Sequence, residues 1–425
     1  MNYKLFIYQF IYLLILCGCS NQKQVRPITS LKHQAIDLGE AFIGYGGFLA
    51  FHQSFIVGLD LAPSVQPFFC IKQDEASQTL FRFGNKGQGP NDFLWPASIQ
   101  HINNRTIGVF DMMSKTYNEF NIPNEHEELK VNKKTEFKTQ LSRVIKTDFN
   151  QYIGLSVEEN MFLLADSTGI LINTFFEYPY KDNDERQFAY RAHAYQGMIS
   201  ANISKNKFVY SSFQGDIVHF YEIENNNIKP IAKIENEYPS YRERDDSYEG
   251  VIFDKDTKIG YIATYATDKF VYAIFSGIKI DEIKSANFEG KTLHVFDWNG
   301  VLVKEYELDV PCSYLCVSDD DSKIWAIASN PEITLVSFDL ENKQNVEIQT
   351  QKTPDPEKNQ TASDNIKHYI FEITKDGAQE EEIQKLRDSI DSQLRNSRNI
   401  NMGSNVETTF DTIADNTIKI RMHFK

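Results

Sequence analysis

The sequence predicts an all-β protein, and three features indicate this class. Aromatic residues are abundant, with 31 Phe and 21 Tyr among 425 residues, and such side chains favour packed strands. Short apolar runs bounded by turn residues recur along the chain, whereas helix-period patterns are scarce before about the last 50 residues. A strand–turn–strand unit also repeats. The length allows one large domain, with or without a small one.

The amino terminus has the pattern of an export signal rather than of a folded element. Residues 5–16 are apolar apart from Gln9, but the run is too short to cross the ~30 Å of a bilayer core. It ends at Leu16-Cys17-Gly18-Cys19, which resembles the lipobox of bacterial lipoproteins. The resemblance implies a signal peptide over residues 1–18, a lipidated Cys19 and a tether over residues 19–30. An ordinary secretory signal is the alternative.

The lipidated cysteine predicts where the protein resides. Acyl chains on Cys19 would hold it stably in a membrane, because each buried CH₂ contributes about 0.8 kcal/mol. No Asp directly follows Cys19, which by family analogy argues against retention in the inner membrane. No acidic run follows it to support export to the cell surface. We expect an outer-membrane lipoprotein that faces the periplasm.

The charge of the chain excludes some partners. Its formal net charge is −15, whereas nucleic acids and anionic lipid surfaces are bound through clusters of Lys and Arg. We therefore expect no nucleic-acid partner. Apart from the membrane that holds the anchor, the expected partner is a protein or a glycan.

Self-comparison reveals an internal repeat of strand, Asp, turn and strand. Residues 293–303 are its clearest copy, and residues 162–172 are a second. Grouping the strands in fours gives six units of about 40–55 residues, which matches the blades of a β-propeller. The approximate units are 46–84, 95–137, 140–178, 193–235, 251–309 and 312–349.

These units predict a six-bladed β-propeller over residues 31–349. Residues 31–38 precede the first complete unit and could pair into the last one, which would close the ring. Seven blades remain an alternative. A β-sandwich also uses many short strands, but it rarely needs about 300 residues of even repeats.

The composition changes after about residue 350. Residues 350–365 form a polar linker that contains two prolines. Residues 366–425 predict a small β-α-β appendage. Apolar residues alternate over 369–373 and 418–424 as in strands, and recur at helical spacing over 379–395. About 60 residues bury little alone, so we expect the appendage to dock elsewhere.

The connection between the first two units resembles a family signature. It reads Phe-Gly-Asn-Lys-Gly-Gln-Gly-Pro-Asn-Asp-Phe over residues 83–93. Six-bladed, TolB-like and NHL-like propeller lipoproteins carry Gly-x-x-Gly-x-Gly-Pro-x-Glu-Phe at this place, and Asp92 departs from their Glu. The segment 268–277 is similar to a second stretch of the same family. The matching positions are Gly84, Gly87, Gly89, Pro90 and Phe93. The resemblance implies the fold and no particular activity.

Physical reasoning gives the same stretch a structural role. Three glycines and a proline within residues 84–90 predict a tight connection with positive-φ positions. A phosphate-binding loop is the alternative. This loop, however, lacks the Gly-Lys-Ser/Thr ending and the following helix of a P-loop.

The remaining motifs give little support for catalysis. His-Glu-x-x-His and Gly-x-Ser-x-Gly are both absent, and the nine His are scattered. Cys312 and Cys316 would lie roughly 13 Å apart on one strand, too far for a disulfide. We expect them and Cys70 to be buried free thiols. We expect no metal and no cofactor.

Two charged and aromatic loops provide the candidate ligand-binding residues. The first is the run 190–195, with Arg191 and His193, and the second is the run 238–246, with Arg242 and Arg244. Loops of this kind carry function on rigid scaffolds. We expect a non-catalytic binding or scaffolding propeller. The alternative is a hydrolase or lyase that acts in the central channel.

Overall fold

The structure, a computed structural model, describes residues 28–38, 41–62, 65–73, 78–103, 105–181, 188–244, 250–283, 288–329, 332–340, 367–374, 406–413 and 417–424. The chain divides into two compact units, Met1–Val346 and Glu347–Lys425, and each is described by itself. Cys19 lies outside the described residues. No helix in the described part of the chain is long and apolar enough to cross a membrane.

The first unit is a β-propeller, and four of its blades are separate antiparallel sheets of four strands. In each of these sheets the strands pair in chain order, so that every blade is a simple meander. The strands are β3 (Gly46–His52), β4 (Phe55–Asp60), β5 (Phe68–Gln73) and β6 (Gln78–Phe83); β9 (Pro96–Asn103), β10 (Thr106–Asp111), β11 (Thr116–Asn121) and β12 (Val131–Glu136); β13 (Leu141–Lys146), β14 (Tyr152–Ser156), β15 (Asn160–Ala165) and β16 (Leu171–Glu177); and β17 (Gly197–Ala201), β18 (Lys207–Ser212), β19 (Asp216–Glu224) and β20 (Asn227–Glu237).

The fifth and sixth blades share one long strand. Their strands are β23 (Tyr261–Ala266), β24 (Phe270–Phe275), β25 (Gly290–Asp297), β26 (Leu302–Val317), β27 (Lys323–Ala328) and β28 (Thr334–Asp339). The first part of β26 pairs with β25, and its second part pairs with β27. The expected break between residues 309 and 312 is wrong, because β26 continues through Pro311. The pairing with β25 is irregular there, which tolerates a residue without an N–H group.

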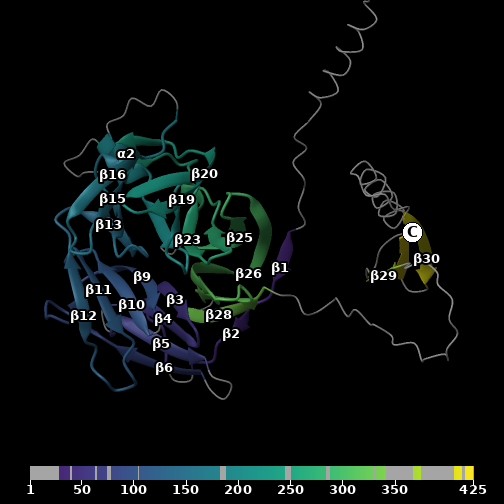
Figure 1. The fold of residues 1–425 in the computed structure, drawn as a ribbon, viewed down its shortest axis with the longest axis horizontal. Helices are drawn as coiled ribbons and strands as arrows, with labels where there is room; N and C mark the ends of the chain where they lie inside the picture. The colour runs from purple at the N-terminus through teal and green to yellow at the C-terminus, as the bar shows by residue number, and fades with distance from the viewer. Residues whose placement is uncertain are drawn as a thin grey trace, which may run out of the picture. The chain divides into compact units, whose positions relative to one another are not determined.

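The amino-terminal segment closes the ring, as predicted. β2 (Gln34–Ala35) pairs with β28 and completes the sixth blade, and the Ile36 N–H donates to the carbonyl of Leu335 at 3.0 Å. β1 (Thr29–Leu31) adds a parallel strand beside β26 at the rim of the fifth blade. The innermost strands β3, β9, β13, β17, β23 and β26 contact one another in a closed circle around the centre (Figure 1). This circle establishes six blades.

The core of the propeller lies between its blades. Six hydrophobic clusters of described residues each join two neighbouring blades. The Phe51 and Trp325 rings stack at 4.7 Å between the first and sixth blades, and aromatic pairs contribute about 0.5–1.5 kcal/mol beyond area burial. The thiols of Cys70, Cys312 and Cys316 are buried and free, as predicted.

The repeated Asp residues stabilise the hairpins that the sequence predicted. Asp297 Oδ1 accepts hydrogen bonds from the N–H groups of Asn299 and Val301, both at 2.9 Å. Asp166 does the same at its own turn, accepting from Thr168 and Ile170. The glycine in each turn has a positive φ, +77° at Gly300 and +87° at Gly169, which explains the repeated pattern.

Two insertions interrupt the repeat. Helix α2 (Phe188–Ala194) lies between β16 and β17, and the hairpin of β21 (Tyr241–Glu243) and β22 (Val251–Phe253) lies between β20 and β23. The predicted blade starts at residues 193 and 251 are therefore wrong. Tyr195 and Tyr241 are buried together in the cluster between the third and fourth blades, so these segments pack as coverings rather than as blade strands.

The second unit contains a three-stranded antiparallel sheet in the order β29 (Lys367–Thr374), β31 (Thr417–Phe424), β30 (Val406–Ile413). The two strands predicted in this unit correspond to β29 and β31. β30 was not predicted, because its Thr-rich stretch has weak apolar alternation, although Thr favours strands. The predicted helix over 379–395 lies outside the described residues.

Candidate functional site

The central channel has two distinct mouths. Because each blade is a meander, the chain enters its innermost strand at the same end as the turn between its second and third strands. At this end, Asp60, the last residue of β4, accepts hydrogen bonds from the N–H groups of Gly44 and Tyr45 just before β3. We call this end the upper mouth, and the end at which the innermost strands finish the lower mouth. α2 and the β21–β22 hairpin both precede innermost strands and so belong to the upper mouth.

A cavity of about 200 Å³ lies at the upper mouth. The first residues of β3 and of the inner part of β26 line it, as do turns of the fourth and fifth blades. Its walls are mainly apolar and aromatic. They include Tyr45, Phe213, Ile262, Phe288 and Tyr314. Tyr45 and Phe288 are 45% and 54% exposed, so the cavity is bordered by accessible aromatic rings.

Arg143, on the innermost strand β13, lies in the channel below this cavity. Its guanidinium lies 5.1 Å from the centre of the Phe48 ring and 5.9 Å from that of Phe213. Nη1 donates to the carbonyl of Ser142 at 2.6 Å, whereas the buried Nε has no hydrogen-bond partner among the described residues. Burial lowers the pKa of Arg143 to about 10, so the side chain is still charged at neutral pH.

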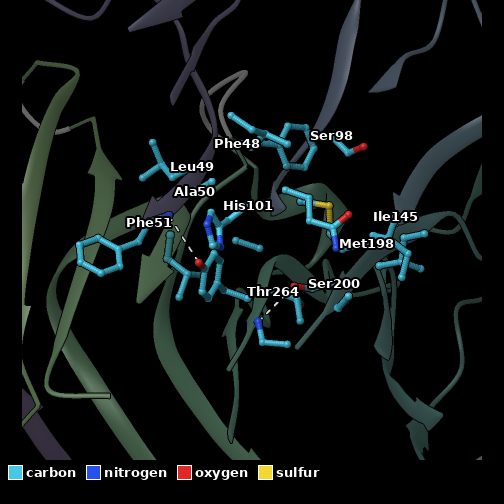
Figure 2. A pocket seen from close by; sticks show the side chains of 18 of the residues that line it. Phe48, Leu49, Ala50, Phe51, Ser98, His101, Ile145, Met198, Ser200 and Thr264 are labelled. Atoms are coloured by element: carbon cyan, nitrogen blue, oxygen red, sulfur yellow. Dashed lines mark hydrogen bonds between the residues drawn. The ribbon is translucent and has the colours of Figure 1, made fainter. Parts of the chain in front are cut away.

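The channel pocket itself is narrow, with a volume of about 60 Å³, and all six innermost strands line it. Figure 2 shows Phe48, Leu49 and Phe51 of β3 around the same space as His101 of β9 and Thr264 of β23. Tyr314 lines both this pocket and the upper cavity, so the two spaces meet beside it.

The lower mouth carries titratable groups. The His52 and His101 rings stack with centroids 3.7 Å apart and planes inclined by 11°. Neither ring nitrogen of His52 has a hydrogen-bond partner among the described residues. Burial lowers the pKa of His52 although Asp319 opposes the shift, and burial raises the pKa of Asp319. A neutral imidazole and a nearby carboxyl group can in principle transfer protons.

Imidazole and carboxylate groups such as these can also bind metal ions. Among the parts of the chain that the structure describes, no group of three or more His, Cys, Asp and Glu side chains is arranged to hold a metal ion. His52, His101 and Asp319 therefore do not form a metal site in this structure.

The four residues predicted from the two charged loops belong to two neighbouring segments on the upper side, α2 and the β21–β22 hairpin with the residue that follows β21. α2, which carries Arg191 and His193, contacts β22, the partner strand of β21, which carries Arg242. The Arg191 guanidinium lies 4.4 Å from the centre of the Tyr180 ring and 3.4 Å from Glu177 Oε2. Arg244 follows β21. None of these four side chains lines the upper cavity or the channel pocket.

The glycine-rich connection satisfies its own backbone groups. Gly87 N–H donates to the Phe93 carbonyl at 3.2 Å, and Gly89 N–H donates to Asp92 Oδ2 at 2.9 Å. Gly84 has φ +78°, and a Cβ there would lie 2.8 Å from the Phe68 ring. Phe93 is buried with its ring edge-on to Phe68 at 4.8 Å, whereas Pro90 is exposed. These N–H groups are used internally and do not point at a ligand.

Sequence reasoning missed Arg143, Tyr314 and the His52–His101 pair. The available signal was a charged residue on the first strand of a repeat unit, because Arg143 lies among the apolar residues Leu141, Val144 and Ile145. Such a residue faces the channel once the ring closes. Its neighbours Phe48 and Phe213 come from other blades, so no local pattern joins them.

Comparison with known proteins agrees with this architecture. A family model described as TolB-like 6-blade propeller-like matches residues 28–320. No curated protein matches the sequence. Similar solved structures include an exported-protein candidate of Bacteroides fragilis, with 14% identity and a TM-score of 0.47 over 73% of this chain and 94% of that one. A DUF4221 family member from Bacteroides vulgatus has 12% identity and a TM-score of 0.44 over 74% and 98%. A 6-phosphogluconolactonase candidate of Bacteroides uniformis has 9% identity and a TM-score of 0.41 over 70% and 82%. At these values the three neighbours carry no argument about function.

Proposed function

The chain belongs to the family of TolB-like six-bladed propellers, and from this premise we propose that it is a non-catalytic binding propeller whose partner enters the upper mouth. We also propose that the protein is an envelope lipoprotein, which is anchored through Cys19 to the outer membrane and faces the periplasm. The partner is a protein or a glycan. The proposed anchor would keep the binding face close to polymers of the envelope.

One observation carries the proposal: the larger cavity, both insertions and most of the exposed aromatic residues that the structure describes lie at the upper mouth. Trp95 precedes β9 and is 54% exposed, the same exposed fraction as that of Phe288 at the rim of the cavity. Both N–H groups of Leu94 and Trp95 donate to Asp111 Oδ2, which holds this segment at the upper end. Exposed aromatic rings on a rigid support are typical of surfaces that bind proteins or sugars.

The test compares the two mouths. Phe288→Asp places a charge at the upper cavity, where Phe288 is 54% exposed. Phe149→Asp places a charge at the lower end, where Phe149 is 43% exposed. Glycan and peptide arrays probed with purified protein should yield binders that Phe288→Asp loses and Phe149→Asp retains. Binding lost only in Phe149→Asp, or equally in both variants, would contradict the proposal.

Catalysis in the channel is the second candidate, and the His52–Asp319 neighbourhood favours it. A neutral imidazole near a carboxyl group could act as a general base towards a substrate in the lower mouth. Turnover of model esters, lactones or glycosides that His52→Gln abolishes would support this function over simple binding. Activity that is equal in both proteins would come from a contaminant.

A further inference from the structure

We propose that the upper cavity binds a small monoanionic ligand with an apolar body and a carboxylate group, and that Arg143 holds the carboxylate. This inference rests on the proposed role of the upper mouth as a binding site, and it adds a small ligand inside the cavity to the protein or glycan proposed to bind there.

The guanidinium of Arg143 carries a positive charge that burial has partly desolvated. No described carboxylate forms an ion pair with this guanidinium, and the group that faces it is the neutral phenol of Tyr314. Phe48 and Phe213 flank it on two sides. A cation in such a place has lost water without gaining a counter-ion, and its Nε donor is unused among the described residues. An anionic ligand would supply both the charge and the acceptor.

The walls and volume of the upper cavity suit an apolar ligand body. The upper cavity has apolar walls that include Ile262, Ile327 and Ile333. An apolar cavity of about 150 Å³ takes up a benzene molecule. The cavity of about 200 Å³ therefore has room for one ring and a short chain.

The acid group of the ligand would lie at the inner end of the cavity, on the side of Arg143. Arg143 lines the channel pocket and not the upper cavity, but Tyr314 lines both and Phe213 lies beside the guanidinium. We therefore place the carboxylate at the inner end of the ligand, where it extends past Tyr314 towards Arg143. Arg and carboxylate have matching planar geometry and can form two parallel hydrogen bonds. The hydroxyl of Ser329, which lines the same cavity, is buried without a partner among the described residues and offers one further donor.

A ligand with one negative charge suits this site better than a ligand with two. The whole chain is strongly acidic, with a net charge of −15, so its long-range field repels anions. One uncompensated guanidinium can balance one negative charge. A monoanion such as a carboxylate fits this site better than a phosphate dianion, which usually takes several cations or a nest of N–H groups.

Matched probes test the inference. 3-Phenylpropionate and 3-phenylpropanamide have nearly the same size and differ in charge. By calorimetry at neutral pH, the purified protein should bind the acid about tenfold more tightly than the amide, because hydrogen bonds to charged groups are the stronger ones. Arg143→Met should bind both equally. Ile333→Trp, which fills the cavity, should bind neither.

Several results would overturn the inference. These are equal affinity of the unaltered protein for the two probes, binding of neither probe, or a preference for the acid that survives in Arg143→Met. If the unaltered protein binds both probes equally and Ile333→Trp binds neither, the upper mouth is still a binding site, but the proposed carboxylate recognition by Arg143 is wrong. The comparison of Phe288→Asp with Phe149→Asp tests the proposed function separately.

Discussion

Arg143 has a counter-intuitive energetic role, because its charge should reduce stability. The side chain is only partly exposed and has no ion-pair partner among the described residues. Replacing it with Met keeps the length and apolar contacts of the stem and removes the desolvated charge. We expect Arg143→Met to raise the free energy of unfolding by about 1 kcal/mol, measured by urea denaturation.

Lys146 on the same strand provides the matched control. Its ammonium lies 2.8 Å from Glu119 Oε2, and both side chains are largely buried. Lys146→Met removes a compensated charge and leaves Glu119 with the neutral Tyr152 hydroxyl at 3.1 Å and the more distant ammonium of Lys133 at 3.8 Å. It should destabilise the fold by about 2 kcal/mol. If both substitutions destabilise equally, the charge of Arg143 is compensated in solution.

Asp60 should make stability depend on acidic pH. Its fully buried carboxylate accepts hydrogen bonds from Gly44, Tyr45 and Ala62 N–H groups and from Arg82, which together hold its pKa below the ordinary value. A lowered folded-state pKa stabilises the fold above about pH 4 and ceases to do so as pH falls through that lowered pKa. Asp60→Asn should therefore cost about 2 kcal/mol at pH 7 and clearly less at pH 3.

Denaturant titrations of the two proteins at both pH values measure this difference. Asp339→Asn, whose side chain is 54% exposed, serves as the control and should change stability by less than about 0.5 kcal/mol at either pH. A cost for Asp60→Asn that is the same at pH 3 and pH 7 would refute the electrostatic account.

At the scale of elements, the closure of the ring depends on a very short strand. β2 has two residues, and the Ile36 N–H beyond it donates to Leu335. Ile36→Pro removes this donor and should cost about 3 kcal/mol, measured by denaturation. Ile36→Val keeps the N–H group and should cost about 1 kcal/mol for the missing methylene. Equal costs would mean that closure depends on the side chain alone.

Elements that depend on local interactions could be predicted from the sequence, and elements that depend on distant parts of the chain could not. The hairpins at Asp166 and Asp297 were predictable because Asp, Gly and the flanking strands act within a few residues. β26 was not, because pairing with two neighbours maintains the strand through Pro311 against its local preference. The proximity of Arg143 to Phe48 and Phe213 was also hidden, since those rings come from other blades and meet it only after closure.

In the whole molecule, the first described strand lies on the outside of the propeller. β1 pairs with residues 306–308 of β26 at the rim of the fifth blade, away from the centre (Figure 1). The ten residues from Cys19 to Ile28 can span at most about 35 Å when extended. A lipid on Cys19 would therefore hold the propeller by its rim, within that distance of a membrane.

This arrangement predicts a difference between two neighbouring cysteines. Cys19→Ala should move the protein from the membrane fraction to the soluble one and abolish the mass added by acyl chains, because no other anchor is expected. Cys17→Ala, which alters a residue expected to leave with the signal peptide, should change neither. Cell fractionation and intact mass spectrometry give both readouts. If Cys19→Ala stays in the membrane with unchanged mass, the protein is held there by something other than lipid on this residue, and the rim attachment loses its basis.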